Sequence, residues 1–369
     1  MALAATKPAL DELEITLIGP GRGECCIIHL GSDRWVIVDS CTDNRTNVPA
    51  ALGYLTSIDA NFDSVELIVA THWHDDHISG LAETLRACSK ARFCTSSALG
   101  SDEFLATVAP YKDRLQFAGG SGAAEIFEVL EELRASHRTP AVRAVQDRRL
   151  VQIAADQFAH NFDCEIWSLS PSDAQLQAFY LEIAALIPQI KDTQRRLPSQ
   201  NKNHMSVVTF VRVGPFSALL GGDLQVTRNP DTGWQPIVRS TGRPASRSTV
   251  FKIPHHGSIN GHHDEVWTSM LQNRPISIGT PYNGGVKPIP SPQDEARISS
   301  LSADFFVTAP AQSGKLRRLP KAVEKTITEQ GVTLRPSEAK TGAIRLRNKG
   351  LRNPSVFSVE LDGLAYRVV

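Results

Sequence analysis

The stretch IVATHWHDDHISG, residues 68–80, places three histidines and two aspartates at the end of an apolar run. His72 and His74 alternate along an extended strand end, so both side chains can face one point. Asp76 and His77 follow on the turn into the next helix and can face a second, neighbouring point. Imidazole and carboxylate groups are ligands that zinc and manganese accept. The spacing therefore predicts half of a site for two divalent ions, because a solvated polar turn does not explain four such residues here.

Two later apolar runs also end in groups that bind metals. The run ALLGGD ends at Asp223, where a carboxylate has no packing role and could bridge two metals. The run FKIPHHGS ends at His255 and His256. Three strand ends with such residues are what an active site at one edge of a sheet requires.

Strand-like and helix-like segments alternate along most of the chain. Apolar runs bounded by glycine-rich turns predict strands, and stretches with helical apolar spacing separate them. This interleaving favours a layered α/β protein, which we expect to form a single domain over residues 1–369. The stretch 96–160 breaks the pattern and carries no cluster of reactive residues, so we interpret it as a mainly helical insertion or cap.

Charge and hydropathy exclude some classes of protein. The formal net charge is zero and the pI is near 7.2, so no global basic excess indicates nucleic acid. No run approaches the roughly 18 apolar residues that a membrane helix needs. The N-terminal segment contains acidic residues where a signal peptide has a basic start. We therefore expect a cytoplasmic protein without membrane insertion, and the sequence leaves its oligomeric state open.

The first motif, followed by ISGL, resembles the signature of the metallo-β-lactamase-fold hydrolases. The order of the later segments SLSPS, NHMSVV, ALLGGD, FKIPHHGS and TGAIRLR resembles the hydrolase domain of bacterial competence (DNA-uptake channel) proteins and its stand-alone relatives. The resemblance implies a four-layer αββα sandwich and a metal-dependent hydrolase. The "HHGS" and "GGD" segments resemble those of a branch that is chiefly associated with nucleic-acid cleavage.

The resemblance also implies which residues hold the two metals. The first metal is assigned to His72 and His74, the second to Asp76 and His77, the bridge to Asp223, and the completion of the second site to His255 of the HHGS pair. Asp39, in VIVDS, matches an aspartate that orients a metal-binding histidine.

The chain departs from the family pattern at two places. The further histidine that most of the superfamily uses for the first metal has two candidates here, His204 and Asn203, and the DNA-uptake branch tends to have asparagine. A Gly-His-Pro segment of that branch is replaced by TPYNGGVKPIPSP, residues 280–292, which has no histidine. The contact or proton transfer that this histidine provides is therefore lost or comes from another group.

We expect two divalent ions, Zn²⁺ or Mn²⁺, to activate a bridging hydroxide that Asp76 also holds. His256 is the first candidate for protonating the leaving group, with His262 and His263 as reserves, and Ser258 could bond to a substrate oxygen or cap a turn. Residues 313–354 carry eleven basic residues against three acids. Within this segment we assign substrate binding to Arg317, Arg345 and Arg347, although an ordinary basic surface explains the charge equally well.

Hydrolysis of a phosphodiester in DNA or RNA is the leading functional hypothesis. The first alternative is a small-molecule hydrolase acting on a lactone, thioester, cyclic nucleotide or β-lactam-like bond in a capped pocket. A non-catalytic metal-binding or nucleic-acid-binding module is the third. It predicts missing ligands, whereas this sequence retains nearly all of them.

Overall fold

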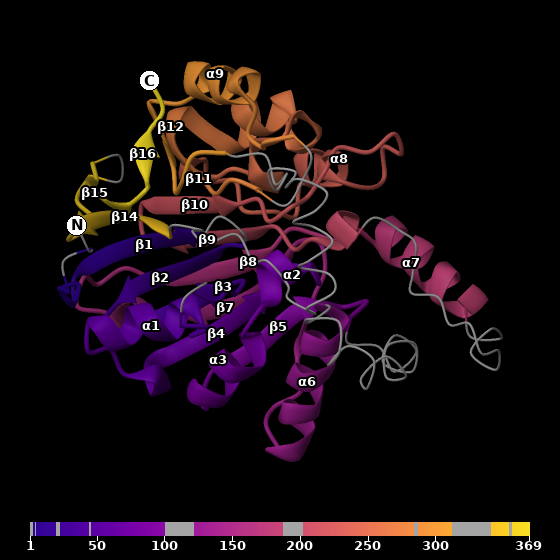
Figure 1. Cartoon of the computed structure of the whole chain (residues 1–369), viewed down its shortest axis with the longest axis horizontal. Coiled ribbons are helices and arrows are strands. Elements are labelled where there is room, and N and C mark those ends of the chain that lie inside the picture. Colours follow the sequence, from indigo (N-terminus) through magenta and orange to yellow (C-terminus); the bar gives the residue numbers. More distant parts are fainter. Residues whose placement is uncertain are drawn as a thin grey trace, which may run out of the picture.

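The computed structural model describes residues 3, 5–19, 23–43, 46–99, 122–186, 202–283, 287–311, 341–353 and 356–369. Two eight-stranded sheets lie face to face at its centre (Figure 1). The first sheet has the order β15-β14-β1-β2-β3-β4-β5-β6 and the second the order β16-β13-β12-β11-β10-β9-β8-β7.

The first sheet combines an antiparallel half with a parallel half. Its strands are β1 (Glu12–Gly19), β2 (Cys25–Gly31), β3 (Arg34–Val38), β4 (Val65–Ala70), β5 (Arg92–Ser96), β6 (Val142–Ala144), β14 (Gly342–Lys349) and β15 (Ser358–Gly363). The strands from β3 to β6 are parallel, and the strands from β15 to β3 are antiparallel. The segments that follow β3 and β4 therefore leave the sheet at the same edge.

The second sheet is mixed in the same way. Its strands are β7 (Arg148–Ile153), β8 (Cys164–Ser168), β9 (Thr209–Val213), β10 (Phe216–Leu220), β11 (Ser248–Lys252), β12 (Leu271–Gly279), β13 (Asp304–Val307) and β16 (Tyr366–Arg367). The neighbours β10, β11, β12 and β13 are parallel. The residues after β10 and β11 thus also meet at one edge, where the sequence has Asp223 and the HHGS pair.

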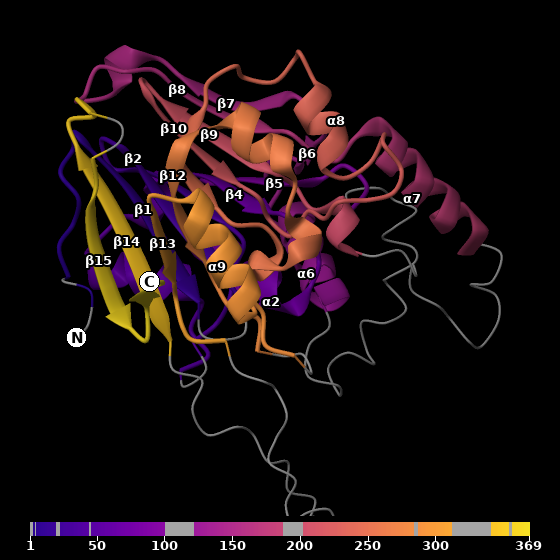
Figure 2. The same ribbon diagram turned by 90° about the horizontal axis from the view of Figure 1, so that it is seen from above.

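Helices cover the outer face of each sheet, as Figures 1 and 2 show. The first sheet packs against α1 (Ala50–Ser57), α3 (Leu81–Ala87) and α6 (Gly122–Ala135), and the second against α8 (Trp234–Arg239) and α9 (Pro292–Leu301). A third apolar cluster fills the space between the two sheets. The α/β class and the four-layer sandwich expected from the sequence are therefore confirmed.

The stretch 96–160, expected as a mainly helical insertion or cap, is partly built into this frame. In its described part, α6 packs on α3, while β6 and β7 extend the first and the second sheet. Residues 100–121 of the stretch lie outside the described residues. A separate helix, α7 (Asp173–Leu186), extends beyond the sheets (Figure 1). Across the described part of the chain, no helix combines the length and apolar character that crossing a bilayer requires.

Candidate metal centre

The first group of possible ligands forms directly after β4. His72 is completely buried, and His74 is partly exposed at the start of the short helix α2 (Asp75–Ile78). With Asp223 they form a group whose donor atoms lie within 4.8 Å of one another. His72 Nε2 and His74 Nδ1 are 2.9 Å apart, so the alternation expected of this strand end brings both imidazoles to one point.

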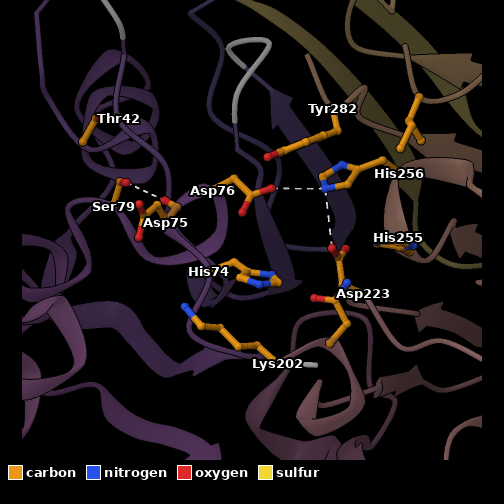
Figure 3. A pocket seen from close by; sticks show the side chains of 12 residues that line it. Thr42, His74, Asp75, Asp76, Ser79, Lys202, Asp223, His255, His256 and Tyr282 are labelled. Carbon is orange, nitrogen blue, oxygen red and sulfur yellow. Dashed lines mark hydrogen bonds and ion pairs between the residues drawn. The ribbon is translucent and has the colours of Figure 1, made fainter. Parts of the chain in front are cut away.

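The second group joins α2 to the loop after β11. Asp76 and His77 lie on α2, and His256 reaches them from the short 3₁₀ turn His255–Gly257. His256 Nε2 is 3.2 Å from Asp76 Oδ2, and His77 Nε2 is 3.8 Å from the same oxygen. Figure 3 shows Asp76 and His256 pointing toward each other across the pocket.

Asp223 lies between the two groups. Its Oδ1 is 3.3 Å from His77 Nε2, and its Oδ2 is 3.9 Å from His72 Nε2 and also 3.5 Å from His256 Nε2. The Ser206 hydroxyl accepts a 2.8 Å hydrogen bond from the Asp223 backbone N–H. The preceding Gly222 has a φ of 51°, and an added Cβ there would collide with the same hydroxyl. This tight turn therefore fixes Asp223 between the two groups.

The unsatisfied buried atoms of this cluster fit divalent ions. His77 Nε2, Asp223 Oδ1 and His256 Nε2 are all buried and have no hydrogen-bond partner among the described residues. A buried polar atom without a partner is costly, and all three atoms face the space between the two groups. Imidazole nitrogens and carboxylate oxygens are the donors that zinc or manganese takes, so the residues present fit such ions.

Burial and neighbouring carboxylates shift the pKa values of the histidines in this cluster. Burial lowers the pKa of His72 well below its ordinary value, and burial also lowers the pKa of His74 to about 4. For His256, burial lowers the pKa, but the Asp223 and Asp76 carboxylates outweigh it and raise that pKa. A histidine with a raised pKa carries a proton that a metal ion would have to displace. Metal binding at His256 would therefore release a proton.

Asp39 contacts the imidazole nitrogen of His77 that points away from Asp223, as its resemblance to an orienting aspartate implies. His77 Nδ1 donates to Asp39 Oδ2 at 2.7 Å, which leaves Nε2 to face Asp223. The backbone N–H and the hydroxyl of Thr71 donate to the two oxygens of Asp39 at 2.7 and 2.8 Å. Asp39 is 2% exposed and has a φ of 62°, a left-handed conformation that aspartate tolerates better than most residues.

A buried ion pair that sequence reasoning missed lies beside this cluster. Glu24 and Lys252 are 3% and 2% exposed and form a direct ion pair. Glu24 Oε1 is 3.5 Å from His77 Nδ1, and Lys252 Nζ donates to the Gly222 carbonyl at 3.1 Å. The pair therefore supports both His77 and the turn that carries Asp223. The available signal was a lysine at the end of strand β11, directly after the apolar pair Val250 and Phe251.

The geometry favours exchanged roles for the two histidines of the HHGS pair. We expected His255 to complete the second metal site and His256 to donate a proton, yet His256 Nε2 faces Asp76 and Asp223. His255 Nδ1 instead lies 2.6 Å from Asn260 Oδ1, on the wall of the pocket. Both residues have a left-handed backbone, with φ of 48° and 54°. This turn directs the His256 side chain, and not that of His255, toward Asp76 and Asp223. Ser258 follows the turn and does not line the pocket.

The two candidates for the further ligand of the first metal are also separated. Asn203 is buried and lines the pocket, whereas His204 is absent from its lining and from the ligand groups formed by the described residues. The reserve proton donors His262 and His263 do not line it either. His262 Nδ1 accepts a hydrogen bond from Trp267 Nε1, and His263 Nε2 lies 3.1 Å from Gln235 Oε1.

The arginines assigned to substrate binding are engaged elsewhere. Arg345 is fully buried in β14 and pairs with Glu360 on the neighbouring strand. Arg347 Nε pairs with the buried Glu14 at 2.7 Å. Arg317 lies outside the described residues. The placement of Arg345 and Arg347 gives their expected role no support, because their charges are neutralised within the sheet.

A pocket of about 480 Å³ opens directly over the two ligand groups. Its lining residues are mostly polar: Thr42, His74, Asp75, Asp76, Ser79, Lys202, Asn203, Asp223, His255, His256, Tyr282 and Ile289. Figure 3 shows Tyr282 and Lys202 on opposite sides, with Asp76, His74 and Asp223 between them. A reacting group that enters this pocket therefore meets both donor groups at once.

Residues 18–101 match the family model of the metallo-beta-lactamase superfamily. The matched segment includes the first motif of possible ligands, from His72 to His77. The members of that superfamily are metal-dependent hydrolases, which confirms the enzyme class expected from the sequence. No curated protein matches the chain.

Solved structures of low identity are also similar to the chain. The metallo-beta-lactamase fold protein YhfI from Bacillus subtilis is 9% identical with a TM-score of 0.38, over 82% of this chain and 98% of that one. MEM-A1, a subclass B3 metallo-beta-lactamase from a soil metagenome library, is 12% identical with a TM-score of 0.34, over 66% and 78%. Similarities this distant say nothing about the substrate of this chain.

Proposed function

We propose that the protein is a metal-dependent phosphodiesterase that cleaves DNA or RNA with two divalent ions. The observation that carries this proposal is the position of Asp223 between the two donor groups, with its carboxylate 3.9 Å from His72 Nε2 of the first group and 3.3 and 3.5 Å from His77 Nε2 and His256 Nε2 of the second. A carboxylate shared in this way is suited to hold two ions close together. Two neighbouring ions would stabilise the attacking and the leaving oxygen of an in-line displacement. Phosphodiester hydrolysis is a displacement of this kind.

The position of Asn203 supports the nucleic-acid branch over other branches. The DNA-uptake relatives that the sequence resembles tend to have asparagine where most of the superfamily has a histidine ligand. Asn203 lines the pocket and the neighbouring His204 does not. The order of the GGD and HHGS segments supports the same branch, with Asp223 and His256 meeting at one edge of the sandwich.

Each candidate ligand can be assigned to one of the two proposed ions. His72 and His74 would hold one ion, Asp76, His77 and His256 the other, and Asp223 both. When bound, such ions supply an activated water near neutral pH and stabilise negative charge on a phosphoryl group. Asp39 keeps His77 in the tautomer with Nε2 toward the cluster, and Glu24 with Lys252 supports the same histidine from behind.

Cleavage of labelled single-stranded DNA, duplex DNA and RNA by manganese- or zinc-loaded protein tests the proposal. We expect hydrolysis of at least one polymer, and we expect Asp76→Ala to lower the rate by more than the roughly hundredfold that loss of an outer-shell partner costs. Asp63→Ala is the matched control, because Asp63 pairs with Lys90 on the surface. A metal-loaded, folded protein that cleaves no polymer contradicts the proposal. Lactone, thioester and β-lactam substrates in parallel would then identify the small-molecule alternative.

A further inference from the structure

Lys202 is the one lysine or arginine among the described residues that line the pocket. It begins the short 3₁₀ turn Lys202–Met205, so the turn that places Asn203 in the pocket also brings this cation. Its ammonium lies 5.6 Å from the centre of the Trp73 ring, and Trp73 is itself packed against Phe179. A rigid aromatic neighbour therefore holds the lysine at the pocket wall, beside His74 (Figure 3).

The surroundings of Lys202 leave its charge available. The side chain is half-buried, and burial lowers its pKa, while Asp75 and Asp76 act in the opposite direction. No carboxylate of the described residues lies within ion-pair distance of its ammonium. Asp75 accepts a hydrogen bond from the Gly122 backbone, and Asp76 faces His256. A partly desolvated ammonium in such a place gains most from an anionic group that the ligand brings.

The charge of the whole pocket points the same way. The pocket is lined by three carboxylates, from Asp75, Asp76 and Asp223, and by the Lys202 ammonium. Two bound divalent ions would offset the three carboxylates, so an anionic group entering beside Lys202 would not be repelled by them. Anionic substrates are therefore favoured over neutral lactones or esters.

We propose that Lys202 binds a non-bridging oxygen of a phosphoryl group and thereby selects phosphodiesters over neutral substrates. The inference rests on the proposed function and adds the residue that recognises the substrate's charge. An ammonium contributes here as a point charge, so an arginine at the same position keeps the interaction, and an apolar side chain of similar length removes it.

Binding of inorganic phosphate to the manganese-loaded full chain, measured by isothermal titration calorimetry, tests the inference without relying on turnover. We expect Lys202→Met to weaken phosphate binding by about tenfold to a hundredfold, the range for losing one hydrogen bond to a charged group. Lys202→Arg keeps most of the affinity. Lys90→Met is the matched control, because Lys90 lies on the surface beside Asp63. A separate manganese titration shows that each variant still binds metal.

Two results would overturn the inference: phosphate binding by Lys202→Met as tight as in the unmodified protein, or no phosphate binding by the unmodified protein. Failure of the proposed function has a different signature. In that case phosphate binds and depends on Lys202, while neither DNA, RNA nor bis(4-nitrophenyl) phosphate is hydrolysed. If hydrolysis occurs, the loss in kcat/KM on Lys202→Met should be large for bis(4-nitrophenyl) phosphate and small for a neutral nitrophenyl ester.

Discussion

His77 Nδ1 donates a 2.7 Å hydrogen bond to Asp39 Oδ2, and this contact decides which nitrogen of the imidazole faces Asp223. Both side chains are buried, so neither can readily exchange its partner for water. The Asp39 carboxylate is held by Thr71, which follows β4 directly. The orientation of His77 thus depends on two adjacent parallel strands, β3 and β4.

We predict that Asp39→Asn lowers metal affinity by about tenfold to a hundredfold, because outer-shell partners of a metal-binding histidine contribute in that range. Competition titration against a chelating dye measures the change. Asp59→Asn is the matched control, since Asp59 is exposed and also has a left-handed backbone, with a φ of 55°. Equal metal affinity in Asp39→Asn and Asp59→Asn would show that this hydrogen bond does not orient a ligand.

The two histidines of the HHGS pair give a second prediction. His256 faces Asp76 and Asp223, whereas His255 contacts Asn260, so only the loss of His256 should remove a ligand. We expect His256→Asn to retain about one metal ion after dialysis and His255→Asn to retain two. Asparagine suits the left-handed backbone of both positions, so strain is matched. Elemental analysis by mass spectrometry gives the stoichiometry, and a reversed pattern would restore His255 as the ligand.

The sequence was sufficient to predict which candidate ligands that follow regular strands come together. His72 and His74 alternate on a strand end, and Asp223 ends an apolar run, so their positions follow from β geometry. The choice between His255 and His256 could not be made from the sequence, because it depends on two consecutive left-handed residues, which the letters HHGS do not reveal.

Longer-range partners were harder to predict for a different reason. Glu24 lies beside His77 and Asp223, and β11 brings Lys252 to it as a counter-ion, but nothing local to Glu24 in the sequence indicates these contacts. Arg345 and Arg347 alternate on a strand and were interpreted as a surface for phosphates. The adjacent strands β15 and β1 supply Glu360 and Glu14, which absorb these charges. Strand pairing across the whole chain decides such outcomes.

A third prediction concerns the buried pair of Glu24 and Lys252. Lys252→Met should lower the free energy of unfolding by about 3–5 kcal/mol, because it leaves Glu24 buried without its counter-ion. The double variant Glu24→Gln with Lys252→Met should recover part of that loss, since no charge then remains unpaired. Urea unfolding in the presence of EDTA separates this effect from metal binding. Lys7→Met is the control, because Lys7 pairs with Asp33 at the surface, and such pairs contribute at most about 1 kcal/mol.

If the double variant is no more stable than Lys252→Met, the cost comes from lost packing around the lysine stem and not from the unpaired carboxylate. The hydrogen bond from Lys252 to the Gly222 carbonyl is lost in both variants, so it cancels in this comparison. The difference between the two therefore reports the Glu24 charge together with its contacts to Thr280 and His77.

The last prediction concerns pH and a histidine far from the pocket. His29 is fully buried, its Nδ1 donates to the Glu12 carbonyl at 2.8 Å, and its Nε2 accepts from the Asp33 backbone N–H at 3.2 Å. Protonation would turn Nε2 into a donor that opposes the Asp33 N–H, and burial lowers the pKa of His29 from 6.5 to about 4. The unfolded chain therefore binds this proton first as pH falls, so stability decreases between about pH 6.5 and pH 4, by about 3 kcal/mol in full. Urea unfolding at pH 7 and pH 5 measures the change. In His29→Gln that pH dependence should be smaller, and an unchanged difference between the two pH values would show that other groups cause it.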